Sequence, residues 1–323
     1  MPAAYTKGLH EVADGVHAYL QPDGGWGWSN AGLISGEGAS TLIDTLFDLR
    51  LTQEMLDVMG PITKVRPITA LVNTHANGDH CYGNQLVAGG SVDVIATNAA
   101  AAEMDEAPPA AMAGMMAMAD DLPPELGDFL RHAFGPFRFD DIEPTAPNRT
   151  FSDTESITVG GRRIELYEVG PAHTAGDLLA WLPDASVVFT GDILFIHGTP
   201  IIWAGPVANW ITACDRIVDL SPAVIVPGHG PLTDAEGVRA VRDYLRFIDD
   251  GTRVRHEAGM APLDAALDLD AEVDNTPYGV WGDRERIIVN VQTLWTTLEP
   301  GYARPGIAEL MGGMAHYAAT HRR

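Results

Sequence analysis

Cysteine is scarce in this sequence of 323 residues. Its two cysteines, Cys81 and Cys214, are too few for a disulfide framework. The opening residues, MPAAYTKGLHEV, lack the charged segment and apolar run of a secretion signal. We therefore expect a cytoplasmic protein. Long apolar runs are also missing. The Ala- and Met-rich residues 99–119 are interrupted by acidic residues and prolines, so they are not expected to cross a membrane.

Basic residues are few as well. The chain has 20 Lys and Arg against 44 Asp and Glu, which gives a net charge of −24. This charge repels nucleic acid and anionic lipid surfaces, so neither is expected as a partner. Hydrophobic residues make up 46% of the chain and charged residues 20%, a composition that supports a full core and argues against disorder.

Patterns of apolar residues predict alternating strands and helices. The expected strands are residues 15–22, 31–35, 40–44, 68–74, 92–96, 157–159, 163–169, 178–182, 187–190 and 223–226. The expected helices are residues 49–59, a start at 79–87, residues 210–220 and most of the chain after 235. This order predicts an α/β protein with mostly buried strands.

Two segments have a different character. Residues 99–150, rich in Ala, Met and Pro, predict a helical insertion outside the sheet. Residues 235–323 predict a helical C-terminal extension that follows a core of residues 1–234. Because methionine packs adaptably around apolar ligands, Met115 and Met116 are candidate substrate contacts of a lid. The alternative for the insertion is a surface that contacts another subunit, and we expect a homo-oligomer.

Histidine and aspartate follow the ends of the predicted strands, next to Gly or Pro. Ligand and catalytic groups concentrate in such loops. Imidazole and carboxylate groups suit zinc, iron or manganese, and six of them are enough for two metal ions. These residues are His75, Asp79, His80, His173, Asp192 and His229.

The segment His75-x-Asn77-x-Asp79-His80 resembles the His-x-His-x-Asp-His motif of the metallo-β-lactamase-fold superfamily. The later His173, Asp192 and Gly-His229 follow in the order of that family, and the resemblance covers residues 12–232. It implies a four-layer αββα sandwich, here with a helical insertion and a helical C-terminal extension.

The resemblance also implies two metal sites. The first would use His75, Asn77 and His173, the second would use Asp79, His80 and His229, and Asp192 would bridge them. The implied cofactor is zinc, one or two ions per chain, with iron or manganese as alternatives. Asp79 and Asp192 would be the catalytic carboxylates, and a metal-activated water would be the nucleophile. The implied function is hydrolysis of an ester, lactone, thioester or activated ether in a small apolar or aromatic molecule.

Asn77 stands where the family motif has a second histidine, and it leaves several interpretations open. Asn77 acts as a weak ligand of a two-metal centre, or only the second site binds metal. A third interpretation is a non-haem iron dioxygenase that uses His75, His173 and Asp192 as a facial triad. A fourth is a subunit with a degenerate site in a hetero-oligomer.

Three further residues are candidates for the substrate pocket. Trp26 and Trp28 form either an aromatic wall for the substrate or ordinary core packing. His197, five residues after Asp192, contacts the substrate or lies on the surface. The nearest clear cation after the Asp192 loop is Arg216, so a highly anionic substrate is not expected.

Overall fold

The computed structural model describes residues 4–106 and 108–321. Within this part of the chain, the strands form a seven-stranded and a five-stranded sheet. The first sheet has the order β1 (Gly8–Ala13), β2 (Val16–Leu20), β3 (Ala31–Ser35), β4 (Ser40–Ile43), β5 (Ile68–Val72), β6 (Asp93–Thr97) and β7 (Arg149–Phe151). The second has the order β12 (Val224–Val226), β11 (Val187–Phe189), β10 (Leu178–Leu182), β9 (Arg162–Glu168) and β8 (Thr154–Val159).

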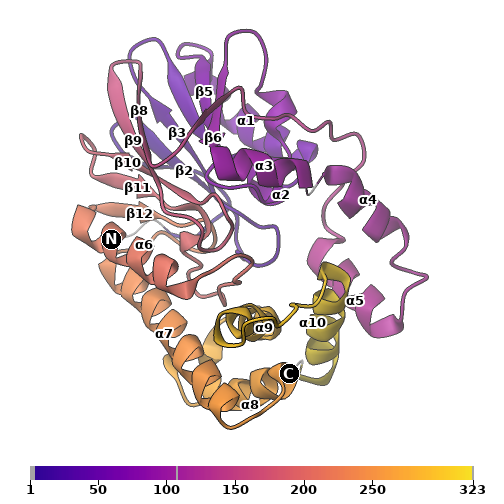
Figure 1. Cartoon of the computed structure of the whole chain (residues 1–323). Helices are drawn as coiled ribbons and strands as arrows, with labels where there is room; N and C mark the ends of the chain where they lie inside the picture. The colour runs from indigo at the N-terminus through magenta and orange to yellow at the C-terminus, as the bar shows by residue number, and fades with distance from the viewer. Residues whose placement is uncertain (1–3, 107, 322–323) are drawn as a thin grey trace.

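Helices cover the outer faces of both sheets (Figure 1). Those beside the first sheet are α1 (Leu49–Thr63), α2 (Gly78–Cys81) and α3 (Asn98–Glu106). Beside the second sheet lies α6 (Val207–Leu220). The insertion carries α4 (Pro109–Ala117) and α5 (Pro124–Phe134), and the C-terminal extension carries α7 (Ala235–Glu257), α8 (Pro262–Val273), α9 (Ile287–Leu298) and α10 (Ile307–His321). Short 3₁₀ helices include η1 (Asn84–Leu86) and η4 (Arg284–Arg286).

The hydrophobic core is divided between the two faces of each sheet. Successive side chains of a strand point to opposite faces. In β3, Ile34 joins the cluster between the two sheets, whereas Leu33 joins the cluster under the outer helices. In β10, Ala180 and Leu179 are divided in the same way. The expected αββα sandwich is therefore confirmed.

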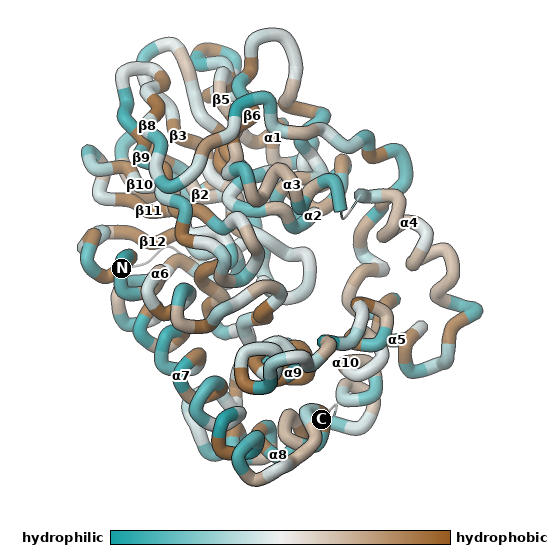
Figure 2. Tube along the Cα trace, viewed as in Figure 1, coloured by the Kyte–Doolittle hydropathy of each residue, from teal (hydrophilic) through white to brown (hydrophobic). Residues whose placement is uncertain are grey.

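The helical extension packs onto the core and onto the insertion. Helix α7 contacts α6, α8 and α9, and α10 contacts both α9 and α5. Every residue of α9 from Ile287 to Trp295 is buried, whereas α7 alternates between hydrophilic and hydrophobic positions in Figure 2. No described helix combines the length and the apolar character that a membrane span requires.

Three local expectations were wrong. Strand β1 was not predicted, because its half-buried residues GLHEVA show no clear alternation. Residues 79–87 do not form one helix: α2 ends at Cys81, and the buried amide of Asn84 donates to Asn73 instead. Finally, residues 149–150 of the predicted insertion belong to β7, a three-residue strand too short to be recognised, which pairs in parallel with β6.

Candidate metal centre

The predicted ligands meet where strand ends of the two sheets come together. His75, Asn77, Asp79 and His80 follow β5 and continue into α2, in the first sheet. In the second sheet, His173 lies between β9 and β10, Asp192 follows β11, and His229 follows β12. Strands β11 and β12 are parallel, so their carboxyl ends reach the same edge. The fold thus brings together groups that are up to 154 residues apart in sequence.

Asp192 lies at the centre of four imidazoles. Its carboxylate oxygens are 3.1 Å from Nε2 of His80, 3.4 Å from Nε2 of His173, 3.4 Å from Nε2 of His229 and 3.7 Å from Nε2 of His75. Side chains of all five residues are at most 4% exposed. A carboxylate in this position can contact metal ions bound to either set of histidines.

The Nδ1 atoms of the histidines are held by acceptors outside the cluster. Nδ1 of His173 is 2.7 Å from the carbonyl oxygen of Ile201, and Nδ1 of His229 is 3.0 Å from that of Gly24. A carbonyl only accepts, so each Nδ1 donates its proton. In the neutral imidazole this leaves the Nε2 lone pair directed at the centre, the arrangement found in metal-binding histidines.

Asp44 orients the first-sheet histidines in the same way. Nδ1 of His80 donates to Asp44 Oδ2 over 2.9 Å. The hydroxyl of Thr74 donates to the same oxygen over 2.8 Å and lies 3.0 Å from Nδ1 of His75. The backbone N–H of Thr74 donates to Asp44 Oδ1 over 2.7 Å. Asp44 therefore supports the loop and fixes two ligand rings.

We expect Asp44→Asn to lower metal affinity about 10- to 100-fold, because partners that orient ligand histidines have effects of this size. Asparagine has one acceptor oxygen, so it cannot replace both Oδ2, which accepts from His80 and the Thr74 hydroxyl, and Oδ1, which accepts from the Thr74 N–H. The measurement is a competitive titration with a chromophoric chelator. Unchanged affinity in a folded variant would contradict the role assigned to Asp44.

The polar atoms of the cluster are buried and spaced as metal binding requires. Nε2 of His75, Nε2 of His80 and Oδ1 of Asp192 are buried without a hydrogen-bond partner among the described residues. Two groups have potential ligand atoms close enough to share one ion, namely His75 with His80 and Asp192, and Asp79 with His80 and His229. Unpartnered buried nitrogen and oxygen atoms are costly unless something binds them. The donor set of imidazoles and carboxylates suits zinc.

The charges of the cluster are strongly coupled. Burial acts to raise the pKa of Asp192, but the imidazoles of His229, His80 and His75 hold that pKa well below its usual range. Burial acts to lower the pKa of His229, but Asp192 and Asp79 raise it to about 9. Without metal, protons on the imidazoles therefore balance the carboxylates. A metal cation would displace those protons on binding.

Asn77 lies beside the first set of ligands. Its amide nitrogen is 3.0 Å from Nε2 of His173. Although Asn77 is the N-cap residue of α2, its side chain makes no capping hydrogen bond. Rotation of the amide would bring its oxygen to the same place as a neutral ligand. The geometry thus permits Asn77 to act as a ligand and supports a further prediction.

We expect Asn77→His to raise the affinity of the first site for metal about tenfold or more, because imidazole is a stronger ligand for zinc than an amide. Asn77→Ala is the matched variant and should lower that affinity. Both effects are measured by chelator competition. Equal affinities in the wild type and both variants would show that Asn77 is not a ligand.

A buried carboxylate holds the loop that carries His173. Asp177 is 2% exposed and accepts from the backbone N–H of Thr174 over 2.9 Å and from its hydroxyl over 2.7 Å. Burial raises the pKa of Asp177 to about 8. The folded protein therefore binds this proton more tightly than the unfolded chain does.

The raised pKa of Asp177 determines how its contribution to the free energy of unfolding changes with pH. Below about pH 4 the Asp177 carboxyl is protonated in both states, and its contribution to stability is lost as the pH rises towards 8. We expect Asp177→Asn to make the fall in unfolding free energy between pH 5 and pH 8 smaller by at least about 1 kcal/mol, since one pKa unit corresponds to about 1.4 kcal/mol. Urea unfolding at both pH values measures it; parallel pH profiles would contradict it.

An apolar cavity of about 220 Å³ opens onto the cluster. The candidate ligands Asn77, Asp79, His173, Asp192 and His229 line it. Both added segments contribute apolar side chains to its wall. These are Met112 and Phe134 from the insertion, and Ile307 and Met311 from the extension.

The structure separates the predicted substrate contacts. Trp26 lines the cavity, whereas Trp28 is not part of its lining and packs against Phe137 with ring centroids 4.9 Å apart. His197 is exposed and also lies outside the lining. Met115 and Met116 do not line the cavity. Met112 lines it instead, because α4 turns a different face towards the candidate ligands.

Arg286 is a charged residue of the cavity that no sequence pattern predicted. It is 2% exposed, its guanidinium carbon lies 4.3 Å from the Trp26 ring centroid, and it donates to the carbonyl of Thr199 over 2.9 Å. Arg216, the nearest cation by sequence, instead covers the ring of Tyr167. No motif marks Arg286, which reaches the site only through the packing of the extension. The cation nearest the site is therefore Arg286 and not Arg216, the residue that sequence proximity indicated.

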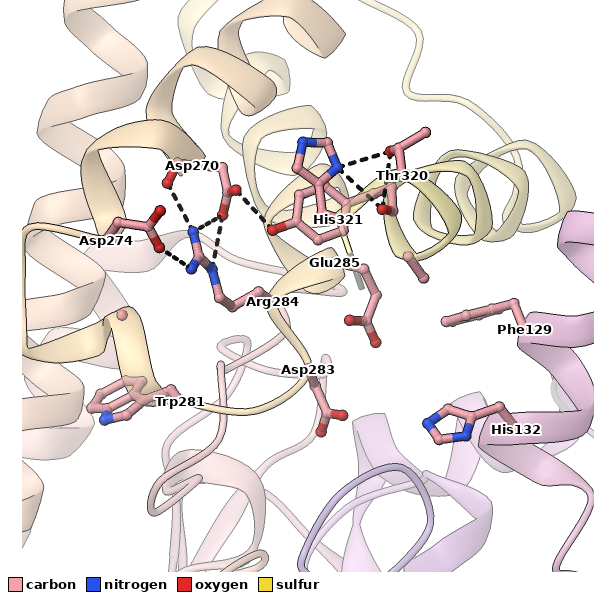
Figure 3. A pocket seen from close by; sticks show the side chains of 13 residues that line it. Phe129, His132, Asp270, Asp274, Trp281, Asp283, Arg284, Glu285, Thr320 and His321 are labelled. Carbon is pink, nitrogen blue, oxygen red and sulfur yellow. Dashed lines mark hydrogen bonds and ion pairs between the residues drawn. The ribbon is translucent and has the colours of Figure 1, made fainter. Parts of the chain in front are cut away.

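A larger cavity, of about 620 Å³, lies among α5, α8, η4 and α10 (Figure 3). None of the predicted ligands lines it. Arg284 pairs there with Asp270 and Asp274. Glu285 connects the two cavities, because it accepts a hydrogen bond of 2.7 Å from the indole N–H of Trp26. The smaller cavity is the candidate active site, because predicted ligands line it and do not line the larger one.

Comparisons with known proteins agree with this site. The model of the metallo-beta-lactamase superfamily matches residues 24–229, which is more than half of the chain. The chain therefore belongs to the metallo-beta-lactamase superfamily, as its motifs indicated. Members of this superfamily are mostly metal-dependent hydrolases, and the His/Asp groups described above could hold metal.

The names of similar proteins indicate more than one activity. A hydroxyacylglutathione hydrolase from Brucella ovis is 36% identical over 147 residues, which are 42% of this chain and 54% of that protein. A beta-lactamase-like protein 2 homolog from Caenorhabditis elegans is 31% identical over 93 residues, 29% of this chain and 30% of that protein. The chain thus spans about half or less of the length of these relatives.

Solved structures show the same fold. The sec-alkylsulfatase Pisa1 from Pseudomonas sp. aligns with a TM-score of 0.66 and 22% identity, covering 94% of this chain and 52% of that one. A metallo-beta-lactamase from Pontibacter korlensis aligns with a TM-score of 0.54 and 19% identity, covering 75% of this chain and 99% of that one. The sulfatase structure therefore aligns with more of this chain than the β-lactamase structure does.

Proposed function

We propose that this chain is a metal-dependent hydrolase that cleaves an ester-type bond in a small apolar or aromatic molecule. The observation that carries the proposal is the convergence of four imidazole Nε2 atoms on Asp192, at 3.1 to 3.7 Å, beside an apolar cavity. Zinc is the proposed metal, two ions per chain, with manganese or iron as alternatives.

The chemistry that bound metal supplies in such a site is a hydroxide nucleophile at neutral pH, because coordination lowers the pKa of water to about 7. Asp79 lines the cavity, and its Oδ2 lies 3.3 Å from Nε2 of His229. Burial acts to raise the pKa of Asp79, but His80 and His229 lower it overall, so the carboxylate is ionised. In this proposal Asp79 orients the attacking water, and Asp192 fixes the position of the two sets of histidines relative to each other.

The cavity favours a small substrate. Its volume of about 220 Å³ is below the 300–1,000 Å³ that is typical of sites for drug-sized ligands. Trp26, Phe134 and Met112 offer apolar contacts, and Arg286 supplies one positive charge. The names of similar proteins support thioesters and sulfate esters as substrates to test, and we retain carboxylic esters, lactones and activated ethers.

Other functions fit the site less well. An iron dioxygenase would use His75, His173 and Asp192, but it leaves His80 and His229 without a role, although both lie close enough to Asp79 to share an ion. A degenerate subunit would not require the buried, unpartnered Nε2 atoms of His75 and His80. We therefore favour hydrolysis.

The test is turnover of a panel of aryl carboxylic esters, thioesters, lactones, aryl ethers and aryl sulfates by zinc-loaded protein, with oxygen uptake recorded in parallel. We expect hydrolysis of at least one class, loss of activity after chelation and no oxygen consumption. Oxygen uptake with a single bound iron would overturn the proposal in favour of the dioxygenase. No turnover of any class by fully metal-loaded protein would count against catalysis.

A further inference from the structure

The segment of residues 199–204 surrounds the metal ligand His173. The carbonyl of Ile201 accepts the Nδ1 proton of His173 over 2.7 Å. The backbone N–H groups of Trp203 and Ala204 donate to the carbonyl of His173 over 3.0 and 3.1 Å. Both the ring and the backbone of His173 therefore depend on where this segment lies.

The segment has no regular secondary structure, so its backbone groups need partners from elsewhere. Helix α9 supplies them. The amide of Asn290 donates to the carbonyl of Pro200 over 2.8 Å and accepts from the N–H of Ile202 over 2.7 Å. The hydroxyl of Thr293 donates to the carbonyl of Ile202 over 2.7 Å.

Residues next to α9 complete this attachment. Arg286, at the helix N-cap, donates to the carbonyl of Thr199 over 2.9 Å, and Arg304, after the helix, donates to that of Trp203 over 2.5 Å. The side chain of Asn290 is fully buried. Its donor and its acceptor both bind the segment, on either side of Ile201, so the amide fixes the position of the carbonyl that holds His173.

We infer that Asn290 and Thr293 are positioning residues of the metal centre, which orient His173 through the carbonyl of Ile201. In this arrangement the C-terminal extension supports the first metal site through the segment of residues 199–204, from which Asn290 is about 90 residues distant in sequence. The second set of ligands, Asp79, His80 and His229, has no such link to α9, because the Nδ1 atoms of its two histidines bind Asp44 and Gly24.

A purely structural role for α9 predicts a different result. Val289 is also fully buried on α9 but has no polar group to bind the segment. If α9 only packs against the core, any loss of metal affinity should be the same at both sites for all three variants, Val289→Ala, Asn290→Leu and Thr293→Val. If Asn290 and Thr293 position His173, only their variants should weaken the first site selectively.

The test is a titration of the metal-free full-length chain with Co²⁺, monitored by visible absorption. The binding step that His173→Ala removes or weakens is assigned to the first site. We expect Asn290→Leu and Thr293→Val to weaken that step at least about tenfold and to change its spectrum, as loss of a ligand-orienting partner does. The other step should change less than about twofold. Thr293→Ser, which keeps the hydroxyl, should restore the wild-type titration.

Val289→Ala is the control for loss of packing and should leave both steps and their spectra unchanged. Wild-type Co²⁺ binding by Asn290→Leu and Thr293→Val would overturn the inference. So would equal weakening of both steps, or failure of Thr293→Ser to restore the first. Thr293→Val removes one hydroxyl from a β-branched side chain, so it tests the same attachment with less risk of unfolding than Asn290→Leu.

Discussion

Replacing Asp192 with alanine is expected to reduce hydrolysis by at least about 10³-fold, because loss of even one group that stabilises a transition state costs 10²- to 10³-fold in other enzymes. Asp192 lies within 4 Å of Nε2 in all four histidines of the centre. Without it, two sets of imidazoles lose their common carboxylate. Steady-state turnover of the best substrate, with metal in excess, measures the effect.

The matched comparison is Asp177→Asn, which changes a buried carboxylate that supports the neighbouring His173 loop but lies outside the ligand set. It should retain a substantial part of the activity. Activity of Asp192→Ala within tenfold of wild type, in a folded protein, would mean that the site has been assigned wrongly.

Removal of metal is expected to destabilise the fold. A ligand that binds only the folded state at a free concentration of 1,000 times its Kd contributes about 4 kcal/mol to stability. For a protein of this size, that contribution corresponds to a fall in Tm on the order of 10 °C. The physical reason is that Nε2 of His75 and Nε2 of His80 are buried and need a partner. Thermal unfolding with and without a chelator measures the shift.

Asp192→Ala is also the control for this prediction. Because it removes the carboxylate shared by both sites, its Tm should respond little to the chelator. A chelator that leaves the wild-type Tm unchanged would contradict a resident metal. An equal shift in wild type and Asp192→Ala would place the bound metal elsewhere in the chain.

The residues that meet in the candidate metal centre could be predicted from sequence because each follows a strand whose apolar pattern is clear. The run before His75 is β5, and those before Asp192 and His229 are β11 and β12. The order of the motifs then indicated the family and, through it, the sandwich of two sheets. Local patterns carry this information because strands that are buried on both faces appear in the sequence as short, continuous apolar runs.

Contacts between distant segments could not be predicted in this way. Arg286 reaches the cavity because α9 and η4 dock onto the core, and Met112 does so because of the orientation of α4. Asn290 reaches the segment of residues 199–204 through the same docking. Each is one polar or apolar residue in a helix, with no spacing that marks it. His197 illustrates the reverse case, since its closeness to Asp192 in sequence does not bring it into the cavity.

We propose above all that the buried histidines and aspartates form a metal centre. Elemental analysis of protein purified without chelators, with metal counted per chain, tests it most directly. We expect close to two zinc or manganese ions per chain in the wild type and a loss of metal in Asp192→Ala. Wild-type protein that stays nearly free of metal even after dialysis against zinc would contradict it.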